Sequence, residues 1–123
     1  MSAIHKGKAG EREFCKWLDS NFDLPKLPTR NLDQTREGGT DVIYPPFAFE
    51  VKRREVIDLQ SWWIQAKKDA TVLGLEPVVA FRQNRKPWEF LVSAKHIGCE
   101  LGFIRLTEST FKAWADGVWQ AHL

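Results

Sequence analysis

The stretch FAFEVKRRE, residues 47–55, decides how the chain folds. Alternate residues of a β-strand point to opposite faces, so this strand presents two different surfaces. One face is apolar and is predicted to be buried in a core; it consists of Phe47, Phe49 and Val51. The other face follows Ala48 with a carboxylate, Glu50, and an ammonium group, Lys52. The pattern therefore predicts a strand with one structural face and one polar face.

A second strand is predicted directly before it, in the run DVIYPP at residues 41–46. Pro45-Pro46 separates two β-rich runs, which indicates an antiparallel strand pair with a non-standard turn. Asp41 opens the first strand, eight residues before Glu50. The pair can therefore bring these two carboxylates together near one end of the sheet.

A third carboxylate is predicted to approach from a helix over residues 8–20. Phe14, Trp17 and Leu18 form one helical stripe, and Glu11 falls on the same inward side. A carboxylate on the core side of a helix is costly unless it has a partner. Alternatively, Glu11 lies in the first turn simply because acids stabilise the helix dipole there. We expect this helix to pack over the face that carries Glu50.

Three clustered carboxylates repel one another unless a cation neutralises them. Oxygen-only ligation is what Mg²⁺ prefers, and the predicted ligands are Asp41, Glu50, Glu11 and the Val51 carbonyl. A bound metal lowers the pKa of its water and stabilises charge on a phosphate under attack. Lys52 would orient that water or offset the developing charge. The pattern indicates phosphodiester hydrolysis, although a Glu–Lys pair on a strand is often only a surface ion pair.

The rest of the chain predicts a single mixed α/β domain over residues 1–123. Asp58 is a plausible N-cap for a helix that ends at Gly74, and its apolar stripe includes Trp62 and Trp63. Further strands are predicted at PVVAF, 77–81, and WEFLV, 88–92. A C-terminal helix over 108–122 has an apolar stripe that fits the core, or less readily a partner surface.

The net charge of +2 does not by itself indicate a nucleic-acid binder, but basic residues cluster locally. Such clusters either contact phosphates or are solvated surface. Cys15 and Cys99 have no CxxC spacing, which favours free thiols in a reducing cytosol. The scattered histidines predict no zinc site. No run is long enough to span a membrane and no signal peptide is evident, so a cytoplasmic protein is expected.

The ordered set GGTDV, 38–42, followed by FAFEVKRRE resembles the PD-(D/E)XK nuclease superfamily. KGKAGEREFCKWL, 6–18, is similar to the start of archaeal-type Holliday-junction resolvases. The chain is closer still to small phage-encoded proteins described as candidate Holliday-junction resolvases, over about residues 6–92. Thr40 stands where the superfamily name has proline.

The resemblance implies a restriction-endonuclease-like fold, a small mixed sheet flanked by helices. It implies that Asp41 and Glu50 bind metal, that Lys52 is the catalytic lysine, and that Glu11 completes the site. Gln65 resembles a glutamine often found on the helix after the E-x-K strand. Arg12 matches an arginine used toward DNA, and the other expected phosphate contacts are Arg30, Arg36, Arg53, Arg54, Arg82, Arg85 and Lys86.

Three functions are consistent with these residues. The first is a Mg²⁺-dependent endodeoxyribonuclease, with Mn²⁺ as a substitute, that resolves four-way junctions in phage recombination or replication inside a bacterial host. Resolvases act as homodimers because a junction needs two paired cuts. The second is a nickase or restriction-like enzyme on duplex or branched DNA. The third is a non-catalytic DNA-binding module that keeps the fold.

Overall fold

The computed structural model describes residues 3–32 and 39–122. Three helices, a short 3-10 helix and five strands follow one another in this part of the chain. In order they are α1 (Ala3–Asn21), β1 (Val42–Tyr44), β2 (Phe47–Arg53), α2 (Leu59–Leu73), β3 (Glu76–Arg82), β4 (Glu89–Ser93), η1 (Ala94–Ile97), β5 (Phe103–Thr107) and α3 (Glu108–His122). The described helices include none that is long and apolar enough to cross a membrane. The α/β class predicted from the sequence is confirmed.

The strands form one mixed sheet in the order β1-β2-β3-β4-β5. β1 and β2 are antiparallel and joined by the Pro45-Pro46 turn, as predicted. β2 and β3 are parallel and are connected through α2, whereas β3, β4 and β5 are antiparallel to their neighbours. The parallel pair therefore lies inside the sheet, with its two carboxyl ends side by side at Arg53 and Arg82.

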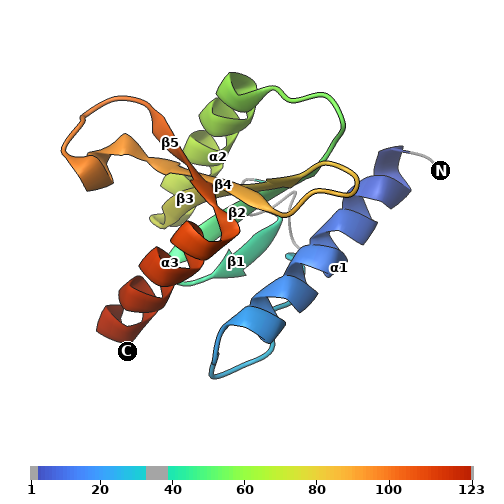
Figure 1. Cartoon of the computed structure of the whole chain (residues 1–123), viewed down its shortest axis with the longest axis horizontal. Coiled ribbons are helices and arrows are strands. Elements are labelled where there is room, and N and C mark those ends of the chain that lie inside the picture. The colour runs from blue at the N-terminus through green and yellow to red at the C-terminus, as the bar shows by residue number, and fades with distance from the viewer. Residues whose placement is uncertain (1–2, 33–38, 123) are drawn as a thin grey trace.

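One face of the sheet packs against α1 and α3, which lie on the same side (Figure 1). Phe47, Phe49 and Val51 of β2 contribute to this core, as their alternation predicts. The rings of Phe90 and Phe111 stack with their centroids 3.8 Å apart, and this contact fixes α3 on β4. The C-terminal helix is therefore part of the core, and its apolar stripe is explained without a partner.

The opposite face packs against α2, which lies behind the sheet in Figure 1. Trp62, Trp63 and Ala66 pack here on Val79, Phe81 and Leu91. Asp58 caps the helix, because its Oδ1 accepts a hydrogen bond from Ser61 N at 3.4 Å. Gly74 ends it in the left-handed conformation, with φ of 66°. Both helix boundaries agree with the sequence prediction.

The first helix was expected to pack over the face of β2 that carries Glu50, and this prediction is wrong. Glu50 and Lys52 project from β2 on the side that α2 covers, and α1 packs on the apolar side of the same strand. The reason is that the phenylalanine face needs the larger apolar cover, which α1 and α3 supply together. The helix is also longer than the predicted 8–20, and the strand at Phe103–Thr107 was not predicted.

Candidate active site

Asp41 and Glu50 lie side by side where β1 meets β2. The backbone N–H of Asp41 donates to the Phe49 carbonyl at 3.1 Å, which extends the antiparallel ladder by one residue. The Asp41 carboxylate turns back over β2, and its Oδ2 accepts from Val51 N at 2.7 Å. This hydrogen bond places the carboxylate next to the backbone between Glu50 and Lys52. The predicted proximity of the two acids is therefore present in the structure.

Glu50 and Lys52 form an ion pair on the polar face of β2. The distance between Lys52 Nζ and Glu50 Oε1 is 3.4 Å, and the Glu50 side chain is only 5% exposed. The second carboxylate oxygen of Glu50, Oε2, is buried and has no hydrogen-bond donor among the described residues. A buried charged oxygen without a donor is costly, so this atom marks a place where a cation or a proton is needed.

The two acids also perturb one another electrostatically. Burial raises the pKa of Glu50 to about 8, and the nearby Asp41 charge adds to this rise while Lys52 opposes it. Burial likewise raises the pKa of Asp41 to about 6, against the stabilising hydrogen bond from Val51. Two carboxylates whose pKa values are raised together form a site that is short of positive charge.

Glu11 on α1 is the third predicted acid, and it is buried. Its Oε1 accepts from Arg30 Nε at 2.9 Å, so the core-side carboxylate has the partner that its position required. The Glu11 charge adds to the rise in the pKa of Asp41 that burial causes. Arg30 forms a β-bridge with Val42 and so belongs to the edge of the same sheet.

Asp69 on α2 is a fourth acid near the pair, and the sequence analysis missed it. The residue is 8% exposed, and its buried Oδ2 has no hydrogen-bond donor in the described part of the chain. Its charge contributes to the raised pKa of Glu50. Burial raises the pKa of Asp69 itself, against a hydrogen bond from Gln65, one turn earlier, that lowers it. A β-carbon on Gly39 would lie 3.5 Å from Asp69 Oδ2, so the carboxylate reaches the segment before Asp41.

A signal for Asp69 was present in the sequence. The residue stands on the buried stripe of its helix, between Ala66 and Ala70. A charged residue inside an apolar stripe was the same signal that identified Glu11. Gln65 itself is exposed, at the edge of this stripe, as its angular position predicts.

The acids suit a divalent cation that is bound by two carboxylates and water, and not one that is enclosed by protein ligands alone. Across residues 3–32 and 39–122, no three side chains of His, Cys, Asp or Glu converge closely enough to enclose a metal ion. Mg²⁺ commonly binds to one or two carboxylates and keeps several waters. The orphaned Glu50 Oε2 and the raised pKa values of Asp41 and Glu50 match that requirement.

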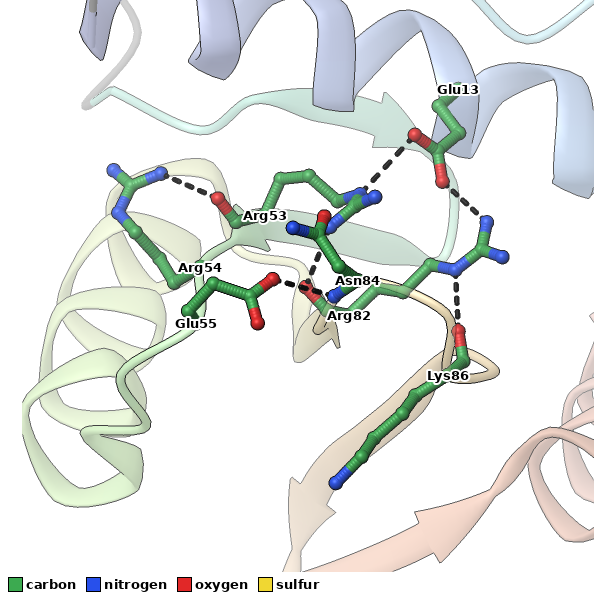
Figure 2. A network of polar contacts seen from close by, with 7 residues as sticks. All are labelled: Glu13, Arg53, Arg54, Glu55, Arg82, Asn84 and Lys86. Carbon is green, nitrogen blue, oxygen red and sulfur yellow. Dashed lines mark hydrogen bonds and ion pairs between the residues drawn. The ribbon is translucent and has the colours of Figure 1, made fainter.

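An arginine cluster lies at the carboxyl ends of β2 and β3 (Figure 2). Glu13 of α1 bridges two arginines that are register partners, Arg53 and Arg82. Glu55 accepts from the backbone N–H of Asn84 at 2.6 Å, which holds the β3–β4 turn against the segment after β2. No local pattern predicted a role for Glu13 or Glu55, because their partners are distant in the chain.

The remaining predicted phosphate contacts differ in their surroundings. Arg12, Arg54, Arg85 and Lys86 are exposed, so they are accessible to a polyanion. Arg30 is engaged with Glu11. Arg36 lies outside the described residues. The structure therefore brings together the basic residues of segments 53–54 and 82–86, as Figure 2 shows, and keeps Arg30 beside the acids.

Comparisons with known proteins agree with this geometry. The family model described as "Phage putative PDDEXK endonuclease" matches residues 3–101. No curated protein sequence matches significantly. A solved structure of Archaeoglobus fulgidus Hjc, described as a Holliday junction resolvase from an archaeal hyperthermophile, has a similar fold. That protein is 21% identical, with a TM-score of 0.52, and the match covers 86% of this chain and 87% of that chain.

The family match contains every element that carries the site. It runs from α1, which supplies Glu11, through β1 and β2 to the helix of Asp69 and the strands beyond it. The similar fold of the archaeal protein is consistent with the restriction-endonuclease-like architecture. We conclude that the chain belongs to this family of phage PD-(D/E)XK endonucleases.

Proposed function

We propose that the protein is a Mg²⁺-dependent endodeoxyribonuclease that cuts branched DNA, with the four-way junction as its preferred substrate. The observation that carries the proposal is the arrangement of Asp41, Glu50 and Lys52 at one end of β2. A buried carboxylate, Glu50, and a half-buried one, Asp41, stand beside a lysine, and one Glu50 oxygen has no donor among the described residues. The cutting of phage recombination or replication intermediates in a bacterial host is the role that fits such an activity.

Asp41 and Glu50 would hold the cation, together with the Val51 carbonyl, and Glu11 would assist from α1. When bound, a divalent cation supplies a water of lowered pKa and stabilises negative charge on the attacked phosphate. PD-(D/E)XK nucleases generally use divalent metals, and Mn²⁺ is expected to replace Mg²⁺ here.

Lys52 would act on the phosphate itself. Its ammonium group is paired with Glu50 and its side chain is only 16% exposed, so its position is well defined. As the water oxygen bonds to phosphorus, negative charge grows on the non-bridging oxygens, and a positioned donor stabilises this charge. The bond to the leaving sugar oxygen then breaks, leaving a phosphate on one DNA end and a hydroxyl on the other. Gln65 lies at the rim of α2, where it would orient the lysine or the water.

The preference for junctions is supported by the archaeal protein of similar fold, which is described as a Holliday junction resolvase. A junction is resolved by two cuts in strands of like polarity, so one enzyme with a single site must act as a pair. We therefore propose that the protein forms a homodimer on its substrate. The exposed arginines provide charge for more than one DNA arm.

The direct test is cleavage of a panel of linear, nicked, flap and four-way DNA with Mg²⁺ or Mn²⁺. We expect paired cuts in the junction by the wild type and losses of at least about a hundredfold for Asp41→Asn and Lys52→Ala. Asp116→Asn, an exposed acid on α3, is the control and should cleave normally. Sedimentation on junction DNA should give two protein chains per junction.

Other outcomes assign other functions. Faster cleavage of linear or nicked duplex would replace the junction assignment with a nickase or restriction-like enzyme. Good DNA binding without cleavage, and no heat of Mg²⁺ or Mn²⁺ binding by calorimetry, would indicate a non-catalytic DNA-binding module.

A further inference from the structure

Two arginines at the carboxyl ends of β2 and β3 are held in fixed orientations. Arg53 and Arg82 are register partners on the parallel strands, so their backbones are immediate neighbours. Arg53 Nη1 donates to the Arg82 carbonyl at 3.4 Å, and Arg82 Nε donates to the Lys86 carbonyl at 2.6 Å. Each guanidinium is thus tied to a backbone carbonyl.

Glu13 of α1 supplies the second restraint on both arginines. Its Oε2 accepts from Arg53 Nε at 3.3 Å, and its Oε1 accepts from Arg82 Nη1. One carboxylate therefore bridges two guanidinium groups, as Figure 2 shows. The trio carries two positive charges and one negative charge, so a net positive charge remains. The side chains are partly accessible, with exposures of 35% for Glu13, 17% for Arg53 and 32% for Arg82.

Each arginine retains unused donors. Among the described residues, neither Arg53 Nη2 nor Arg82 Nη2 has a hydrogen-bond acceptor. An arginine whose fork is already oriented loses less conformational entropy when it binds an oxyanion. The guanidinium groups of both arginines already converge on one oxyanion, the Glu13 carboxylate. A tetrahedral phosphate with several acceptor oxygens suits the donors that remain.

We infer that Arg53 and Arg82 form a clamp for a single phosphate of the DNA backbone, and that Glu13 is the positioning residue that fixes the clamp. This inference rests on the proposed function. The clamp would fix the position of the DNA backbone relative to the acids that bind the metal. Arg53 follows Lys52 directly on β2, and it lies three residues beyond Glu50. Three residues is an odd step along a strand, so the Arg53 side chain leaves β2 on the face opposite Glu50 and Lys52, and the clamped phosphate lies beside the carboxyl ends of β2 and β3 and is not the cut linkage itself.

The exposed cations nearby have a different role. Arg54 is exposed and donates to the Arg53 carbonyl at 3.2 Å, the contact drawn in Figure 2. Such a side chain adds general attraction for the polyanion and not a defined contact. Arg54 is therefore the matched control for the two clamped arginines, since it is adjacent to them and has the same charge.

The experiment measures binding in the presence of a chelator, so that no cleavage occurs. Four-way junctions carry one neutral methylphosphonate linkage at a time, placed in turn at each position around the branch point. Fluorescence anisotropy gives the affinity of the wild type and of Arg53→Lys, Arg82→Lys, Arg54→Lys and Glu13→Gln. Lysine keeps the charge but loses the guanidinium fork, so the test separates geometry from net charge.

We expect one linkage at which the neutral substitution weakens wild-type binding by about tenfold. In Arg53→Lys and in Arg82→Lys this penalty should fall below about threefold, and Arg54→Lys should retain it in full. In Glu13→Gln the penalty should spread over neighbouring linkages, because the two forks lose their common restraint. Circular dichroism melting confirms that each variant is folded, and Arg82→Lys suffices if Arg53→Lys is not.

Several results would overturn the clamp. One is an equal loss of affinity at all linkages in the wild type. Another is a full tenfold penalty in both Arg53→Lys and Arg82→Lys. The third is a penalty in Arg54→Lys that falls as far as in those two variants. An unchanged penalty in Glu13→Gln would remove the positioning role. The result is independent of the nuclease activity, since a linkage-specific penalty without cleavage in Mg²⁺ would retain the clamp and refute only the proposed function.

Discussion

Gly10 of α1 lies against Arg53 of β2 so closely that a β-carbon on Gly10 would come within 2.8 Å of Arg53 Cβ. Real side chains do not approach this closely, so only glycine allows the helix to lie at this distance from the end of the strand. The close approach also carries Glu13, one turn further along α1, to the two arginines that it bridges.

We predict that Gly10→Ala destabilises the protein, although alanine is normally the better helix residue. In an open helix interior the change gains about 0.5–1 kcal/mol. At Gly10 the added methyl group must push α1 away from β2, and overpacking of this kind costs about 1–3 kcal/mol. Gly7→Ala, with nothing within 4 Å of its new β-carbon, is the matched control and should be neutral or stabilising. Urea unfolding measures both; equal stability of the two variants would contradict the close packing.

We predict that the metal-free protein loses stability as the pH rises. The pKa values of Asp41 and Glu50 are raised to about 6 and about 8, above their ordinary values of 3.8 and 4.5. The folded state therefore holds more protons than the unfolded state between pH 4 and pH 8. This contribution to stability is fully present below about pH 4 and is lost as the pH rises through 6 and then 8.

Glu50→Gln isolates this effect from the other titrating groups. The variant cannot ionise at this position, so its advantage over the wild type in free energy of unfolding should grow between pH 5 and pH 9. Added Mg²⁺ should restore wild-type stability at pH 8 and leave Glu50→Gln nearly unchanged. Parallel stability curves for the two proteins across this pH range would refute the raised pKa of Glu50.

We predict that Asp69→Asn weakens binding of the divalent cation without removing any proposed ligand. The Asp69 charge acts on Glu50 from α2, so its loss makes the site less negative. The dissociation constant for Mn²⁺, measured by calorimetry, should rise about fivefold, the effect of one nearby charge through a partly polar medium. Asp116→Asn, which removes an exposed charge of α3, should leave the constant unchanged. An unchanged constant for Asp69→Asn would place this acid outside the site.

We predict that Phe111→Ala costs about 3–5 kcal/mol of stability, the usual range for a buried phenylalanine. Phe111 is fully buried and stacks on Phe90, although α3 lies beyond the residues that the family model matches. Unfolding of the variant in urea measures the loss. Val118 is only partly buried at the edge of the same core, so Val118→Ala should lower the free energy of unfolding by less. A mild effect at Phe111 would show that α3 is dispensable.

Much of this arrangement follows from local pattern in the sequence. The alternation along 47–52 predicted the two faces of β2, and the apolar stripes predicted α2 and α3 with their ends. Glu11 and Asp69 both break an apolar stripe, and each is buried among charges. The choice of helix for each face was not predictable in this way, because periodicity defines the faces of an element and not their partners. Glu13 joins residues 40 and 69 positions away in the chain, so no local pattern reveals it.

The two-sided character of β2 has an evolutionary consequence. Its phenylalanine face holds the molecule together, whereas the acid on its other face works against folding when no cation neutralises it. A lineage that lost Glu50 would therefore keep a well-folded, even more robust protein, with its arginines still displayed. Inactive descendants that survive as DNA-coating or competitor proteins are thus only one substitution away, and selection for cleavage alone must maintain the polar face.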